Sequence, residues 1–233
     1  MAGLHHHSPR GHAPGCVVYA HGGAWVNEIA PQHWTLAAQI AAECTTTVVV
    51  PIYPLVPFGT AQGCVETFVD LVLELRRVHD DDVRLAGDSA GGQIALSTAL
   101  ELRDRHGLTL PLTVLISPAV DLTWSNPGIP VVQPKDPWLG VPGGRVFSEL
   151  WRGDVPVTDQ RVSPIFSDLT DLGPLVVFSG THDILNPDAN RLVDMARAAG
   201  VDVEFHEGDG QLHVYPCSRR GPVSSPAAAS PQR

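Results

Sequence analysis

A serine flanked by glycines near the middle of the chain limits the fold more than any other feature. The run Gly-Asp-Ser-Ala-Gly-Gly occupies residues 87–92, follows a short apolar segment at 83–86 and precedes a helical stretch that begins at Ala90. A G-x-S-x-G pattern between a strand and a helix is typical of a sharp turn that leaves no room for larger neighbours. Such a turn exposes the Ser89 hydroxyl and points the first N–H groups of the helix at developing negative charge. For this motif alone, a tight turn with an incidental serine is the alternative.

Apolar runs and helical patterns alternate along the rest of the chain. Buried strands are predicted at 16–20, 45–50, 83–86, 112–117 and 175–179, and a less buried strand at 201–205. Helices are predicted at 32–44, 61–79, 90–105 and 186–199, the last with Asn186 as its N-cap. This alternation predicts an α/β fold, with a mainly parallel central sheet flanked by helices.

Composition narrows the partners and the compartment. The 233 residues fit one domain, and the formal net charge of −10 argues against nucleic acid or an anionic membrane as a partner. The sequence shows neither an apolar run near the ~20 residues of a membrane helix nor a secretory signal, so we expect a cytoplasmic protein. Cys16, Cys44, Cys64 and Cys217 lack metal or redox spacing and are expected to be reduced, although four cysteines could pair. The histidine tract at 5–7 could bind a metal, but a flexible end is the simpler interpretation.

A serine, an acid and a histidine follow successive predicted strands. Ser89 follows the third strand, Asp183 the fifth, and His213 lies in the loop after the last. Parallel strands bring these loops to one edge of the sheet, and the order Ser, Asp, His is that of an α/β-hydrolase. Because a serine hydroxyl needs a base, His213 is predicted to accept its proton and Asp183 to fix the imidazole. His182 and His206 are the local alternatives to His213.

A glycine pair after the first predicted strand supplies a candidate oxyanion hole. Gly22 and Gly23 follow His21, and their backbone N–H groups, together with that of Ala90, are predicted to stabilise the oxyanion. An ordinary glycine loop is the alternative for this pair.

The motifs together resemble the hormone-sensitive-lipase-like esterases of the α/β-hydrolase fold. The matching stretches are residues 21–25, 53–55, 87–92, 116–122, 136–139, 163–164, 180–185 and 213–216. The resemblance implies hydrolysis of small-molecule carboxylic esters of short to medium acyl chain through an acyl-serine intermediate, without metal or cofactor. It also implies that residues 118–172 supply a partial cap. Ala24 stands where the family has a third glycine, and a negative φ at Ala24 is expected if its N–H is to serve.

The ends of the chain depart from the family pattern. We expect a flexible tail at 1–15, a hydrolase domain at 16–216 with the cap insertion at about 118–172, and a disordered tail at 217–233. The hypothesis is that the start is truncated and the basic, proline-rich tail is out of frame; an evolved disordered tail is the alternative. Without a terminal helix the sheet is expected to expose apolar side chains, which predicts low stability, self-association and reduced activity.

Other functions compete with ester hydrolysis. A peptidase, thioesterase or acyltransferase uses the same three side chains. A non-catalytic small-molecule binder on the same fold is a further alternative, and so is a truncated product that is poorly active or inactive.

Overall fold

One parallel sheet organises the part of the chain that the computed structural model describes, residues 15–79 and 81–218. Within these residues the strand order is β2-β1-β3-β4-β5-β6, and each neighbouring pair is parallel. The strands are β1 (Cys16–Ala20), β2 (Thr47–Val49), β3 (Val83–Asp88), β4 (Thr113–Ile116), β5 (Leu175–Gly180) and β6 (Val203–Gly208). The predicted α/β fold is confirmed. The histidine tract at 5–7 and most of both predicted tails lie outside the described residues.

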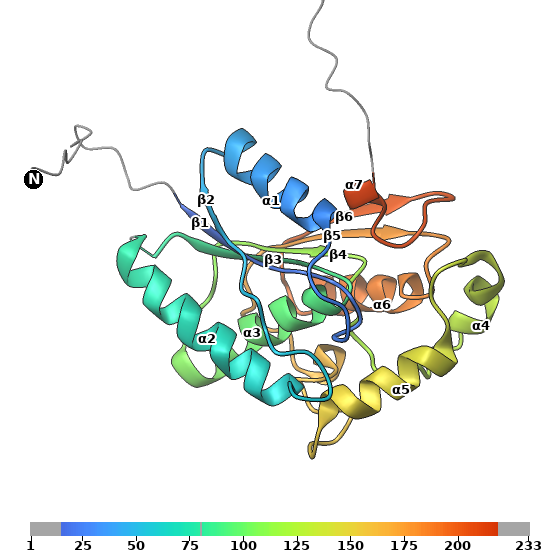
Figure 1. Ribbon diagram of the computed structural model, residues 1–233. Helices are drawn as coiled ribbons and strands as arrows, with labels where there is room; N and C mark the ends of the chain where they lie inside the picture. Colours follow the sequence, from blue (N-terminus) through green and yellow to red (C-terminus); the bar gives the residue numbers. More distant parts are fainter. Residues whose placement is uncertain (1–14, 80, 219–233) are drawn as a thin grey trace, which may run out of the picture.

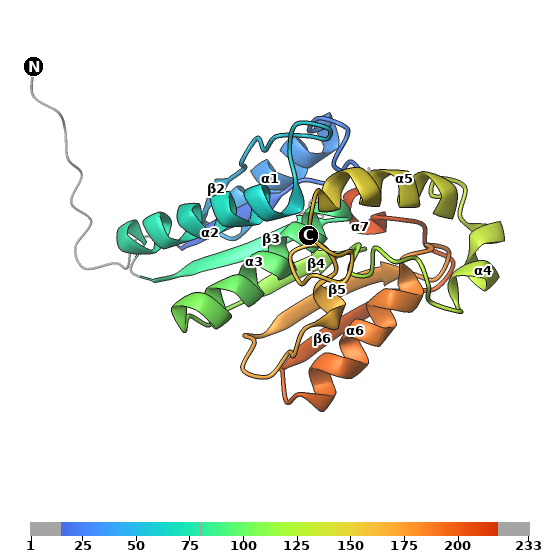
Figure 2. The ribbon, with the colours of Figure 1, turned by 90° about the horizontal axis from the view of Figure 1, so that it is seen from below.

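Helices cover the two faces of the sheet unequally. In Figures 1 and 2, α2 (Ala61–Val78), α3 (Ala90–His106) and α6 (Asn186–Ala198) lie across one face. The other face carries α1 (Pro31–Glu43) and the short α7 (Tyr215–Ser218) (Figure 1). Among the described residues, no helix is long and apolar enough to cross a membrane. The cytoplasmic location stays a prediction from the sequence.

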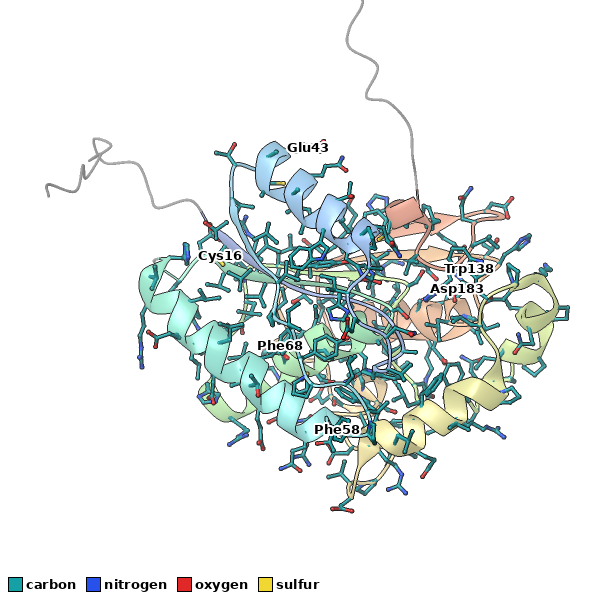
Figure 3. The ribbon with its side chains drawn as sticks, viewed as in Figure 1. Cys16, Glu43, Phe58, Phe68, Trp138 and Asp183 are labelled. Carbon is teal, nitrogen blue, oxygen red and sulfur yellow. The ribbon has the colours of Figure 1, made fainter. Side chains whose placement is uncertain are left out.

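Helix α3 packs tightly against the sheet directly after the serine turn. Ile94, Leu96 and Leu100 are fully buried, in the same core as Phe68 of α2, which Figure 3 labels. A Cβ on Gly91 would lie 2.0 Å from the carbonyl oxygen of Ala20, so a larger residue would push the helix off β1. The glycines after Ser89 therefore set how closely the helix approaches the sheet.

The face under α1 and α7 is only partly closed. Tyr19 and Ala86 are buried there, but Val114, Val176 and Phe178 are only half-buried. The Phe178 ring stacks on His206 of the edge strand β6, with ring centroids 4.6 Å apart. This face carries the partly exposed apolar side chains that the sequence leads us to expect.

The segment predicted to form the cap contains a twelve-residue helix. Between β4 and β5 the chain forms α4 (Ile129–Val132), the 3₁₀ turn η1 (Gln133–Lys135), α5 (Val141–Arg152) and the 3₁₀ turn η2 (Pro164–Phe166). The sequence does not predict α5, because Pro142, Gly143 and Gly144 stand at its start and glycine has a low helix propensity. Proline is nevertheless tolerated in a first helical turn, and Trp151 buries the apolar face of the helix. The limits of the domain and of the cap insertion remain predictions.

The start of α6 differs from the expected cap. Leu185 is the N-cap, so Asn186 is the first helical residue rather than the cap. The Asn186 amide instead donates to Ser179 Oγ at 3.2 Å and to Glu207 Oε1 at 2.9 Å. It therefore joins β5 to β6 instead of satisfying the helix end.

Candidate active site

Ser89 occupies a strained turn between β3 and α3. Its φ of 53° and ψ of −118° lie outside the regions that ordinary L-residues prefer. The backbone holds this conformation because Ser89 N–H donates to the Ile116 carbonyl at 2.8 Å and Ala119 N–H donates to the Ser89 carbonyl at 3.1 Å. A Cβ on Gly87 would lie 2.2 Å from the Gly91 carbonyl oxygen, so glycine is required two residues before the serine.

The acid and the histidine meet beyond the ends of β5 and β6. His213 Nδ1 lies 2.9 Å from Asp183 Oδ2, and both side chains are buried. The other Asp183 oxygen accepts the Leu185 N–H at 2.9 Å. Since an ionised carboxylate only accepts hydrogen bonds, Nδ1 carries the proton and Nε2 is left to act as a base. His206 lies on β6 and pairs with Glu204, so it does not compete for Asp183.

Asp183 also sets the basicity of the imidazole. Burial lowers the pKa of His213, but the charge of the Asp183 carboxylate and its hydrogen bond outweigh burial and hold the pKa above its ordinary value. A base so tuned accepts a proton more readily, and the paired carboxylate stabilises the imidazolium that results.

The structure does not join Ser89 to His213 by a hydrogen bond. Within the described part of the chain, the Ser89 hydroxyl has no hydrogen-bond partner. The histidine loop is nonetheless anchored near the serine turn, because Val214 N–H donates to Ser117 Oγ at 3.0 Å. Ser117 directly follows Ile116, whose carbonyl holds Ser89. Catalytic hydrogen bonds are often long without substrate and shorten in the complex.

One of the predicted oxyanion donors is already occupied. Gly22 N–H donates to Asp88 Oδ1 at 2.9 Å, which contradicts its predicted role as an oxyanion donor. Among the described residues, no group accepts a hydrogen bond from the N–H of Gly23, Ala24 or Ala90. Ala24 has a φ of +53°, so the expected negative φ there is wrong. The Ala24 N–H nevertheless has no partner among the described residues, so Ala24 remains a candidate donor despite its positive φ.

An apolar pocket of about 160 Å³ opens beside Ser89. Ala24 and Ala90 line it next to the serine, and the N-terminal part of α5 forms one wall. Four aromatic side chains also line it: Trp25, Trp124, Trp138 and Phe147. Trp124 Nε1–H donates to Ser148 Oγ at 2.9 Å, and Trp25 Nε1–H donates to Gln93 Oε1 at 3.2 Å. These hydrogen bonds fix two walls of the pocket.

Asp136 links the cap to the acid loop, a role that the sequence does not reveal. One of its oxygens accepts the N–H groups of Trp138 and Leu139, at 2.8 and 3.0 Å. The other accepts the Ile184 N–H at 2.9 Å. Asp136 thus ties the backbone of Trp138 to that of Ile184, which follows Asp183; Trp138 and Asp183 are labelled in Figure 3. The Asp-Pro-Trp-Leu run at 136–139 matches the family pattern, but a carboxylate that bridges two loops leaves no periodic signal.

No cluster of three or more His, Cys, Asp or Glu side chains suited to a metal ion occurs among residues 15–79 and 81–218. The four cysteines are free thiols.

Comparison with known proteins identifies the family to which this fold belongs. A family model described as alpha/beta hydrolase fold matches residues 17–217, and the chain belongs to this family. An esterase of Acinetobacter venetianus is 29% identical over 192 residues, and a triacylglycerol lipase of Mycobacterium tuberculosis is 32% identical over 202 residues. Among solved structures, the hormone-sensitive-lipase homolog EstE7 from a metagenome library has a TM-score of 0.83 at 27% identity. The resemblance to hormone-sensitive-lipase-like esterases is confirmed.

The matches cover most of this chain but less of the relatives. The aligned regions take in 81% of this chain and 63% of the Acinetobacter esterase, and 85% of this chain and 41% of the lipase. The EstE7 match takes in 90% of this chain and 73% of that structure.

Proposed function

We propose that the protein hydrolyses carboxylic esters, with Ser89 as nucleophile, His213 as general base and Asp183 as the residue that orients His213. The observation that carries the proposal is the buried hydrogen bond between His213 and Asp183, on loops at the same sheet edge as the strained Ser89 turn. The names of the relatives, esterase and triacylglycerol lipase, support the same reaction class.

In the proposed reaction these three residues act in turn. His213 Nε2 removes the proton from the Ser89 hydroxyl as its oxygen attacks the ester carbonyl carbon. The negative charge that forms on the carbonyl oxygen is stabilised by the N–H groups of Gly23, Ala24 and Ala90, with Ala24 in place of Gly22. His213 then protonates the leaving alcohol. Water, activated by the same imidazole, releases the acid from the acyl-serine intermediate and restores the enzyme.

The pocket beside Ser89 supports a limit on the acyl group. Its volume of about 160 Å³ is close to the ~150 Å³ of an engineered apolar cavity that holds benzene. Its lining has no charged side chain. We therefore propose uncharged acyl groups of short to medium length, up to about six carbons, as the preferred substrates.

Hydrolysis of p-nitrophenyl acetate, butyrate and octanoate tests the proposal. The wild-type protein is expected to turn over acetate and butyrate faster than octanoate, and Ser89→Ala is expected to abolish all three activities. Equal rates for the two proteins would show that the fold carries no working serine and would favour a non-catalytic binder or an inactive product. An octanoate preference would refute the pocket-size argument alone.

A further inference from the structure

Asp88 connects the two backbone segments that the proposed reaction depends on. It directly precedes Ser89, and its Oδ1 accepts the N–H of Gly22 in the loop after β1. A Cβ on Gly22 would lie 2.2 Å from Asp88 Oδ2, so the carboxylate and the loop backbone are in direct contact. One side chain therefore connects the candidate oxyanion loop directly to the serine turn.

The loop needs such an anchor because its backbone is strained. Gly23, Ala24 and Trp25 have φ values of 127°, 53° and 58°. For residues other than glycine these values cost free energy, so they persist only where the surroundings fix both ends. One end of the loop is held at Trp25. Its indole N–H donates to Gln93, and its carbonyl accepts the Val56 N–H at 2.9 Å. Asp88 holds the other end.

Two side chains support the buried Asp88 carboxylate. Asp88 is 2% exposed; Tyr19 donates its hydroxyl proton to Oδ1 at 2.5 Å, and His33 Nε2 lies 3.4 Å from Oδ2. Burial raises the pKa of Asp88, but the hydrogen bonds from His33, Tyr19 and Gly22 outweigh burial and hold the pKa below its ordinary value. The carboxylate stays charged without a lysine or arginine partner among the described residues.

The tautomer of His33 is fixed by its own helix. Its Nδ1 accepts the Ala30 N–H at 3.0 Å, at the start of α1. A ring nitrogen that accepts a hydrogen bond carries no proton, so the proton of a neutral imidazole lies on Nε2, which faces Asp88. His33 is buried, its Nδ1 caps α1, and its Nε2 lies 3.4 Å from the Asp88 carboxylate.

We propose that His33 is a positioning residue for the oxyanion loop: it holds the Asp88 carboxylate, and the carboxylate holds Gly22 and thereby the Gly23 and Ala24 N–H groups beside Ser89. The catalytic part of this inference rests on the proposed ester hydrolysis. His33 does not line the pocket, so its loss changes the turnover of bound substrate and leaves substrate binding largely unchanged.

Two substitutions separate the two polar contacts of His33, one with Ala30 and one with Asp88. In His33→Asn the amide oxygen reproduces the Nδ1 acceptor for Ala30 but leaves no donor that reaches Asp88. In His33→Gln the longer side chain places an N–H near the position of Nε2. The control is His106→Asn, the same change at the exposed end of α3.

The test combines steady-state kinetics with p-nitrophenyl butyrate and hydrogen exchange of the Gly22 amide. We expect His33→Asn to lower kcat about 10- to 100-fold with KM within about threefold, and to speed Gly22 exchange, as for a loop displaced by up to an ångström. His33→Gln is expected to recover most of kcat, and His106→Asn to match the wild type.

The outcomes distinguish the inference from the proposed function. Wild-type kcat together with wild-type Gly22 exchange in a folded His33→Asn protein overturns the inference. A wild type without activity refutes the proposed function, and faster Gly22 exchange in the variant then still supports the anchor. Should His33→Asn not fold, Tyr19→Phe removes the other side-chain donor to Asp88 without changing the α1 cap, and the same two readouts apply.

Discussion

Removal of the Asp188 charge is expected to stabilise the protein at neutral pH. Asp188 lies in the first turn of α6 and is 1% exposed. Its Oδ1 accepts a hydrogen bond from Asn126 of the cap segment at 2.7 Å, but its Oδ2 has no partner. Burial, with a smaller contribution from the charge of Asp121, raises its pKa from 3.8 to about 6. The folded protein therefore opposes ionisation of this carboxyl.

The sign and size of the effect follow from linkage. A carboxyl whose pKa is raised on folding contributes stability below its unfolded pKa, and that contribution is lost as the pH rises from about 4 to 6. A shift of about two units corresponds to about 3 kcal/mol. The favourable interaction of a negative charge with the N-terminus of α6 is lost as well, at about 0.3–1 kcal/mol. Asp188→Asn is thus expected to gain about 2 kcal/mol at pH 7.5 and little at pH 4.5.

Urea denaturation followed by tryptophan fluorescence at pH 4.5, 6.0 and 7.5 measures this difference. Asp194→Asn, on the exposed side of the same helix, serves as the control for loss of one surface charge. A gain that does not change with pH, or a loss of stability at pH 7.5, would refute the reasoning.

Three further predictions concern the site, the cap and the sheet face under α1 and α7. Asp183→Asn is expected to lower kcat/KM about 10³- to 10⁴-fold, as measured by ester hydrolysis on folded protein. The amide oxygen keeps the Leu185 N–H, so the amide nitrogen faces His213 Nδ1 and donates to it, which moves the imidazole proton to Nε2. Gly144→Ala is expected to destabilise the protein by about 1–3 kcal/mol, since its Cβ would lie 2.3 Å from Trp124 Cζ2. Gly143→Ala, with nothing within 4 Å, is expected to gain about 0.5–1 kcal/mol from helix propensity. The wild type is expected to self-associate in sedimentation velocity, and Phe178→Thr to associate less.

Each of these has a result that contradicts it. Unchanged kinetics in Asp183→Asn would mean that the carboxylate does not orient His213. Equal thermal midpoints for Gly143→Ala and Gly144→Ala would show that Trp124 moves freely. A monomeric wild type at high concentration would contradict association through the face that carries Phe178.

Local sequence patterns predict the sheet and its helices well. Burial on both faces gives the strands near 16–20 and 175–179 a continuous apolar pattern. Burial of one stripe gives the helix from Ala61 a periodic apolar pattern. Helix α5 has no such signal at its start, because Pro142 and two glycines precede its apolar residues. The segment forms a helix because Trp151 packs in the core, a tertiary contact that local sequence does not reveal.

The candidate site was predictable as far as residue type and chain order constrain it. Ser89, Asp183 and His213 stand out because each follows a strand, and the pairing of Asp183 with His213 follows from the parallel sheet. The partner of the Gly22 N–H could not be predicted from the sequence, because it is a side chain 66 residues away. Such a contact depends on the register of β1 and β3, which the sequence does not specify.

Reaction with a fluorophosphonate probe, read by intact mass and peptide mapping, tests the central claim that His213 activates Ser89. We predict one adduct per chain, on Ser89, with a labelling rate that falls by orders of magnitude in His213→Ala and stays at the wild-type level in His206→Ala. No adduct on Ser89, or equal labelling rates in the wild type and His213→Ala, would contradict the claim.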